Sequence, residues 1–175
     1  MNNEKDNVYD LVEDFYAHDE GWNTLLRQEY AEGFLRMEAW KGKKNSDLYR
    51  SWDNLTMLCL YLGSAETFLG DMNADDFIDC IAWCGRNISE FTPDYKNTQD
   101  FLETCDGLFK YLKGKNAISN DTVPGTAAEI LLQEGKMNII LPDGSFDEAN
   151  AERAWNATPD IPCLLYTSDA ADDTP

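Results

Sequence analysis

Apolar residues recur at intervals of three and four positions through most of the first 114 residues, which is the period of amphipathic α-helices. The segments that carry such faces are 8–16, 22–40, 48–62, 77–85 and 98–112. The segment 48–62 is apolar on nearly all sides, which predicts that it is the most buried helix of the set. We therefore predict an all-α fold, a helical bundle of about five or six helices.

Polar residues at the expected helix starts support this interpretation. Asn73 and Asp76 have the spacing of a capping pair, in which each side chain hydrogen-bonds the backbone of the other residue. Thr92 stands directly before a proline, the order expected of an N-cap residue followed by the first helical position. Either Ser46 or Asp47 can cap the helix that carries the segment 48–62.

The composition changes after the bundle, which we place at residues 1–115. Residues 116–125 are rich in Asn, Ser, Asp, Pro and Gly and are expected to form a linker. Residues 126–162 are interpreted as the start of a truncated C-terminal segment. It opens with a short helix capped by Thr126, and an apolar run before Pro-Asp-Gly predicts a short hairpin or turn near 137–147.

The final residues have a different origin in our interpretation. Residues 163–173 read Cys-Leu-Leu-Tyr-Thr-Ser-Asp-Ala-Ala-Asp-Asp, which resembles an in-frame translation of a transposase-based sequencing adapter. We expect residues 163–175 to be adapter read-through and the natural sequence to continue beyond Pro162, so this segment is set aside. Removing its three aspartates leaves 30 acidic and 14 basic residues, a net charge of 14 − 30 = −16.

Charge and composition narrow the classes of protein. The full chain of 175 residues has 33 acidic and 14 basic side chains and a formal charge of −19, which disfavours nucleic acid as the main partner. An apolar content of 43% is too high for a disordered acidic tail. No apolar stretch is long enough to span a membrane and no signal peptide is recognisable. A bacterial cytoplasmic protein without a membrane partner is expected.

The cysteines indicate packing rather than chemistry. Outside the adapter-like segment they are Cys59, Cys80, Cys84 and Cys105, and no two form a Cys-x-x-Cys pair. Cys80 and Cys84 have a spacing that could supply half a metal site, but the chain has a single histidine. We expect buried reduced thiols that act as small apolar residues.

Other candidate constellations are incomplete. Asp71, Asn73 and Asp75 have the oxygen spacing of the first half of a calcium loop, but Asp76 stands where the loop needs glycine and Ala82 where it needs an acid. His18 has acidic neighbours and no nucleophile or metal partner at a fixed spacing, which suits a solvated side chain. We therefore predict no catalytic residue, no metal and no cofactor.

Five tryptophans are numerous for this length. Trp22, Trp40 and Trp52 fall on the predicted helical stripes and are expected to pack in the core. Trp83 lies off the apolar face of its helix, which makes it a candidate anchor for a partner protein.

One stretch of the sequence has a recognisable pattern of helical motifs. The motifs are Ala-Asp-Asp-Phe-Ile at 74–78, Phe-Thr-Pro at 91–93, Phe-Leu at 101–102, Leu-Phe-Lys-Tyr-Leu at 108–112 and Lys-Asn-Ala-Ile at 115–118. Through them, residues 54–118 resemble the helical core-binding, SAM-like domain of tyrosine recombinases and phage integrases. The resemblance implies a DNA-associated domain whose catalytic Arg, His and Tyr belong to a later domain that this chain does not contain. The candidate DNA contacts are Lys110, Lys113 and Lys115.

Charge opposes that implication. Residues 74–118 contain five basic and eight acidic side chains, a net charge of 5 − 8 = −3. The three lysines at its C-terminal end also complement a helix dipole, and that role needs no DNA.

Three functions remain open at this level. The leading hypothesis is a non-enzymatic interaction or regulatory module that binds another protein, because apolar stripes and charged faces are present without a reactive constellation. The first alternative is the integrase-type DNA-associated domain. The second is an acidic protein that mimics DNA and inhibits a DNA-binding enzyme.

Overall fold

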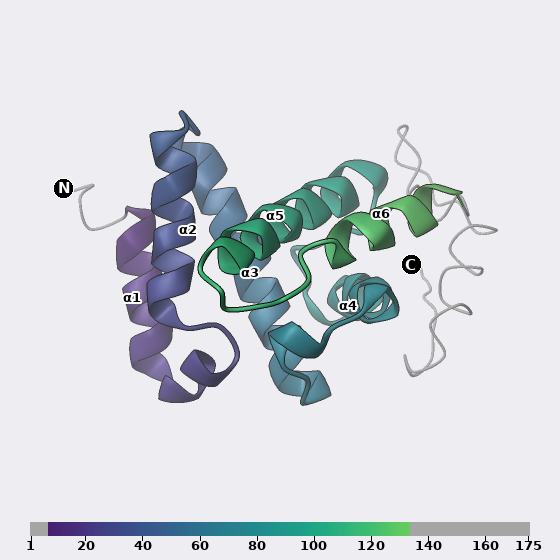
Figure 1. Cartoon of the computed structure of the whole chain (residues 1–175), viewed down its shortest axis with the longest axis horizontal. Coiled ribbons are helices and arrows are strands. Elements are labelled where there is room, and N and C mark those ends of the chain that lie inside the picture. Colours follow the sequence, from purple (N-terminus) through teal and green to yellow (C-terminus); the bar gives the residue numbers. More distant parts are fainter. Residues whose placement is uncertain (1–6, 134–175) are drawn as a thin grey trace. The chain divides into compact units, whose positions relative to one another are not determined.

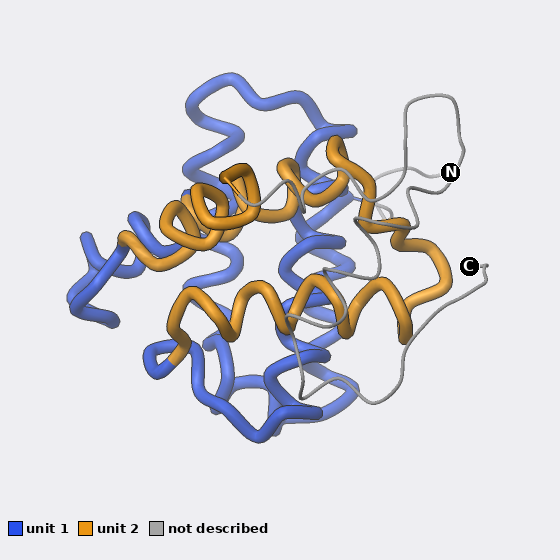
Figure 2. The backbone as a smooth tube through the Cα atoms, turned by 90° about the vertical axis from the view of Figure 1, so that its right-hand side faces the viewer, with its two compact units in different colours: residues 1–71, 107–121 blue, residues 72–106, 122–175 orange. Residues whose placement is uncertain are grey.

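The computed structural model describes residues 7–133, and within them the chain forms six α-helices, two 3-10 helices and no strand (Figure 1). The all-α prediction is therefore confirmed, while the hairpin or turn predicted near 137–147 lies outside the described residues. The chain divides into two compact units (Figure 2). Unit 1 combines residues 1–71 with 107–121, and unit 2 combines residues 72–106 with 122–175.

Unit 1 begins with α1 (Val8–His18), which packs against α2 (Gln28–Trp40) and α3 (Asn45–Ala65). Val8, Val12 and Tyr16 are buried on one face of α1, as its apolar spacing predicts. Leu11, which follows this spacing too, is 41% exposed. It lies at the edge of the stripe, where no other helix covers it fully.

The apolar stripe over 22–40 is divided between two elements. A 3-10 helix, Glu20–Thr24, precedes α2, so the expectation of one continuous helix is wrong. Two side-chain hydrogen bonds stabilise the interruption between these elements. The Asp19 carboxylate accepts a hydrogen bond from the Gly21 amide at 2.8 Å, and the Asn23 side chain accepts one from the Gln28 amide at 2.9 Å. Such local side-chain hydrogen bonds compete with helical ones.

α3 is the longest helix of unit 1 and has ten buried side chains, which confirms the prediction that its segment is the most buried. Its N-cap is Lys44, which makes no side-chain capping hydrogen bond, so neither Ser46 nor Asp47 has the predicted role. The helix ends at Glu66 in the left-handed conformation, with φ 55°, and a short 3-10 helix, Leu69–Asp71, follows.

The tryptophans of unit 1 differ in burial. Trp52 is 4% exposed and Trp22 is half-buried, with its ring stacked on Phe15 at a centroid distance of 4.8 Å. Trp40 is 86% exposed, which corrects its assignment to the core. It is the last residue of α2, and a stripe position is buried only while a neighbouring element continues beside it.

The C-terminal part of α5 (Tyr95–Gly114) completes unit 1 by a close approach to α2. A Cβ at Gly107 would lie 3.2 Å from the Phe34 ring. The hydroxyl of Tyr111 occupies the space that a Cβ at Gly33 would need. These two glycines therefore let the helices pack more closely than larger residues would.

Unit 2 contains α4 (Ala74–Asn87), the N-terminal part of α5, and α6 (Val123–Gln133), which packs against α4. The predicted capping box of α4 is confirmed: the amide of Asp76 donates to the Asn73 side chain and the amide of Asn73 donates to the Asp76 carboxylate, both at 2.9 Å.

The other two helix starts of unit 2 differ from prediction. α5 is capped by Asp94, whose carboxylate accepts from the Asn97 amide at 2.8 Å, and not by Thr92. A carboxylate is as good a cap as a hydroxyl, and it lies directly before the helix. α6 begins at Val123, so Thr126 lies within the helix and its hydroxyl donates to the Thr122 carbonyl at 3.1 Å.

The four described cysteines are free and buried, as predicted. Burial raises the pKa of the Cys59 thiol from its ordinary value of 9.0 to about 12. Burial also raises the pKa of Cys80 well above its ordinary value, with the neighbouring Cys84 adding to the effect. The Cys59 and Cys80 thiols are therefore protonated at neutral pH, and all four buried cysteines are apolar packing groups.

Within residues 7–133, no helix combines the length and the apolar character that a membrane crossing requires.

Candidate functional site

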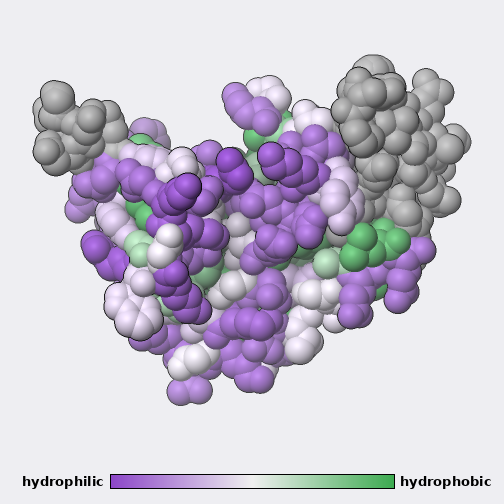
Figure 3. All heavy atoms as spheres, turned by 90° about the horizontal axis from the view of Figure 1, so that it is seen from above, coloured by the Kyte–Doolittle hydropathy of each residue, from purple (hydrophilic) through white to green (hydrophobic). Residues whose placement is uncertain are grey.

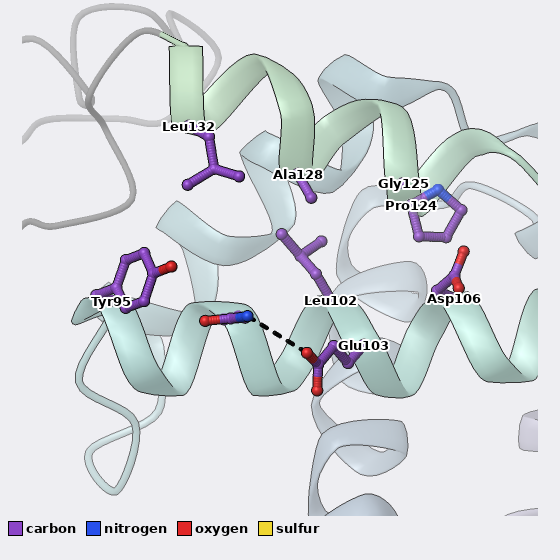
Figure 4. A pocket seen from close by; sticks show the side chains of 9 residues that line it. Tyr95, Leu102, Glu103, Asp106, Pro124, Gly125, Ala128 and Leu132 are labelled. Carbon is purple, nitrogen blue, oxygen red and sulfur yellow. Dashed lines mark hydrogen bonds between the residues drawn. The ribbon is translucent and has the colours of Figure 1, made fainter.

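Unit 2 contains a groove of about 300 Å³ between the N-terminal part of α5 and α6 (Figure 4). From α5 come Tyr95, Gln99, Leu102, Glu103 and Asp106, and from α6 come Pro124, Gly125, Ala128 and Leu132. Both sets recur at helical spacings of three and four residues, so each helix contributes one continuous face. A volume near 300 Å³ is at the lower end of the range of ligand pockets, about 300–1,000 Å³.

The floor of the groove is apolar. Leu102 is 3% exposed and points from α5 toward α6, and Pro124 is also buried (Figure 4). Tyr95 and Leu132 lie at the same end of the groove and are 43% and 53% exposed. These two side chains leave apolar surface open to solvent at that end, which is the kind of surface that binding covers.

The rim of the groove is polar and acidic. The Glu103 carboxylate is exposed and accepts a hydrogen bond from the Gln99 side chain at 3.4 Å. The Asp106 carboxylate lies at the other end of the groove, near Pro124 and Gly125 (Figure 4). A Cβ at Gly125 would be 3.8 Å from Asp106 Oδ1, an ordinary van der Waals distance, so α6 passes close to that carboxylate.

The sequence of α6 explains why the groove is open. Pro124, Ala127 and Leu131 are buried on the face that packs within unit 2. On the adjacent face, Gly125 and Ala128 have little or no side chain, so the space between α6 and α5 is only partly filled. Two small residues one turn apart therefore create the depression.

Unit 2 is also strongly acidic. Its described residues contain nine acidic side chains and two basic ones, a net charge of 2 − 9 = −7. The described residues of unit 1 contain 13 acidic and nine basic side chains, a net charge of 9 − 13 = −4. On the face shown in Figure 3, hydrophilic side chains predominate and apolar surface is confined to small patches.

Trp83, the candidate anchor from the sequence, lies on α4 and is half-buried. Its backbone carbonyl accepts a hydrogen bond from the Asn87 side chain at 2.8 Å. It is not among the residues that line the groove.

The three candidate lysines lie at the C-terminal end of α5, in unit 1, and all are exposed. Lys113 is 3.9 Å from the Asp121 carboxylate, and the Lys115 ammonium lies 5.5 Å from the centre of the Tyr111 ring. Lys113 and Lys115 therefore have local partners within the chain. Lys110 shares the last turns of the helix with Lys113.

The residues of the groove were not predicted as a site. Leu102 was assigned to an apolar stripe, but the exposed positions Tyr95 and Leu132 belong to segments separated by the linker. A usable signal was the pair of small residues on α6, Gly125 and Ala128, on a face that also carries a leucine. In the part of the chain that the structure describes, no group of three or more His, Cys, Asp or Glu side chains could hold a metal ion.

No protein-family model, no curated protein and no solved structure matches the chain.

Proposed function

We propose that this chain is a non-enzymatic interaction module whose groove in unit 2 binds a basic amphipathic helix of a partner protein. The single observation that carries the proposal is the groove itself, which has an apolar floor at Leu102 and carboxylates of Glu103 and Asp106 on its rim. A helix that lays its apolar face in a groove and its cations against a rim is a recurrent mode of peptide recognition.

Charge favours a basic partner over an acidic or neutral one. With a net charge of −7 over its described residues, unit 2 attracts cationic segments and repels nucleic acid and acidic proteins. Tyr95 and Leu132 supply the exposed apolar area that an anchor side chain of the partner would cover.

The proposal is tested by calorimetric titration of the full chain with a synthetic amphipathic helix of leucine and lysine. A peptide of identical composition in scrambled order, which has no apolar face, controls for charge attraction alone. We expect the amphipathic peptide to bind with one site per chain and the scrambled peptide to bind far more weakly. Equal binding of the two peptides would overturn the proposal.

A matched pair of variants locates the site. Glu103→Lys and Glu129→Lys change the net charge equally, and both glutamates are exposed in unit 2, but only Glu103 lines the groove. We expect Glu103→Lys to weaken peptide binding about tenfold and Glu129→Lys to have a much smaller effect. Equal effects of the two substitutions would show that the net charge of the chain, and not the groove, determines peptide binding.

A further inference from the structure

A second feature of the molecule is the end of α2 with the turn to α3, residues 40–44, which we call the basic corner. It begins with Trp40, the most exposed of the large apolar side chains in the described residues, at 86%. Gly42, with φ 104°, makes the turn. Lys41, Lys43 and Lys44 are exposed, and the corner contains no acidic residue. In a chain of charge −19, this is a local concentration of positive charge around an uncovered indole.

The lysines of the corner differ in their local bonds. Lys43 is held by the Glu38 carboxylate at 3.0 Å and lies 3.5 Å from the Ser51 hydroxyl. Lys44 is the N-cap residue of α3, where a cation opposes the positive end of the helix dipole and a capping oxygen is preferred. Lys44 therefore has a charge that is unfavourable for α3. A residue that is unfavourable for the local helix is expected at a surface used for binding.

We infer that the basic corner docks into the groove of unit 2 of a second copy of the chain. The inference rests on the proposed function, because it uses the same groove, and it identifies one partner that has the required chemistry. Trp40 would lie on the apolar floor at Leu102, while Lys41 and Lys44 would meet the rim carboxylates. The two surfaces are complementary in both respects: an exposed aromatic side chain faces an open apolar floor, and cations face carboxylates.

A compact acidic groove suits the corner better than an extended polyanion does. Three lysines neutralise few phosphates, and the 33 acidic residues of the chain repel a nucleic acid or an anionic membrane as a whole. Two copies of the chain also repel each other at long range, but charges farther apart than about 8 Å are screened at physiological ionic strength. The strength of the association is therefore set by the short-range contact between the corner and the groove, and not by the net charges of the two copies.

The predicted contact is between different surfaces of the two copies. Such a heterologous interface does not end at a dimer unless it closes into a ring, because each bound copy still offers an unused corner or groove. We therefore expect oligomers larger than dimers at high concentration.

Analytical ultracentrifugation of the full chain over a range of concentrations tests the inference. The unsubstituted chain should increase in average mass beyond a dimer as its concentration rises. Trp40→Ser, which lacks the anchor, and Glu103→Lys, which lacks a rim carboxylate, should each stay monomeric. A mixture of these two variants should form a one-to-one heterodimer and nothing larger, because one variant keeps its groove and the other keeps its corner.

Controls separate this interface from general effects. Leu11→Ser removes a side chain that is 41% exposed elsewhere in unit 1, and Glu129→Lys changes charge outside the groove. Both variants should associate like the unsubstituted chain. Lys44→Asp should lose association while raising the melting temperature, a combination that unfolding cannot produce.

The inference is overturned if the unsubstituted chain is monomeric at every concentration, or if it associates but the mixture of variants does not. Peptide titration distinguishes its failure from that of the proposed function. Trp40→Ser keeps an intact groove, so it should bind the leucine-lysine peptide with unchanged affinity. Peptide binding without self-association leaves the proposed function standing and removes only the second copy as the partner.

Discussion

The hydroxyl of Tyr111 lies against the backbone of Gly33, in the space that a Cβ at position 33 would occupy. The ring of Phe34, the residue after Gly33, packs edge-on against the Tyr111 ring, with 6.2 Å between the two ring centres. The contact between α2 and α5 in unit 1 therefore depends on the absence of a side chain at one position.

Gly33→Ala should destabilise the protein by about 1–3 kcal/mol, because the added methyl forces the half-buried Tyr111 ring to move from its contact with α2. The measurement is the midpoint of urea denaturation. Gly114→Ala is the matched control, since no atom lies within 4 Å of the Cβ it adds, and it should not destabilise the chain. An unchanged midpoint for Gly33→Ala would contradict this packing of α5 on α2.

Alkaline pH should unfold the protein. Burial raises the pKa of Cys59 from 9.0 to about 12, and burial also raises the pKa of Tyr16, whose hydroxyl donates to the Leu26 carbonyl. The unfolded chain therefore releases these protons at lower pH than the folded chain. Stability is fully retained below pH 9 and is lost as pH rises toward 12, by about 1.4 kcal/mol per pH unit for each such group.

The check on this prediction is the free energy of unfolding measured at several values between pH 9 and pH 12. Cys59→Ala removes one of the groups with a raised pKa, so its stability should fall less steeply with pH than that of the unsubstituted chain, even if its stability at neutral pH is lower. Parallel curves for the two proteins would show that Cys59 does not contribute to the alkaline loss.

Lys44→Asp should stabilise the protein by about 0.5–2 kcal/mol, because an aspartate at the N-cap of α3 supplies the missing capping oxygen and suits the helix dipole. Thermal denaturation followed by circular dichroism measures the change. Lys41→Asp makes the same charge change at the C-cap of α2, where the dipole disfavours an anion, and should not stabilise the chain. A lower melting temperature for Lys44→Asp would argue against the observed start of α3.

The helices were predictable because their signals are local. The apolar spacing of α1 and the reciprocal bonds of Asn73 and Asp76 depend only on neighbours within a few residues. Whether Trp40 is buried or exposed was not predictable in the same way, because a side chain on an apolar stripe is buried only if a segment distant in the sequence covers it. Its exposure follows from the end of α2.

The groove lies beyond such local reasoning. Leu102 and Ala128 line it from two helices that the sequence separates by a linker, and no pattern within either helix shows that they face each other. The capping of α5 by Asp94 was missed for a smaller reason, since the Thr-Pro pair two residues earlier has an equally good N-terminal signal.

The most direct test of the central claim is a map of peptide binding on the full chain by NMR. Addition of the leucine-lysine amphipathic peptide should shift the amide resonances of residues 95–106 and 125–132, which hold most of the lining of the groove, far more than those of α1. The same shifts should be much weaker in Glu103→Lys. Shifts spread evenly over acidic residues, or centred on Lys110 and Lys113, would contradict a binding site in the groove of unit 2.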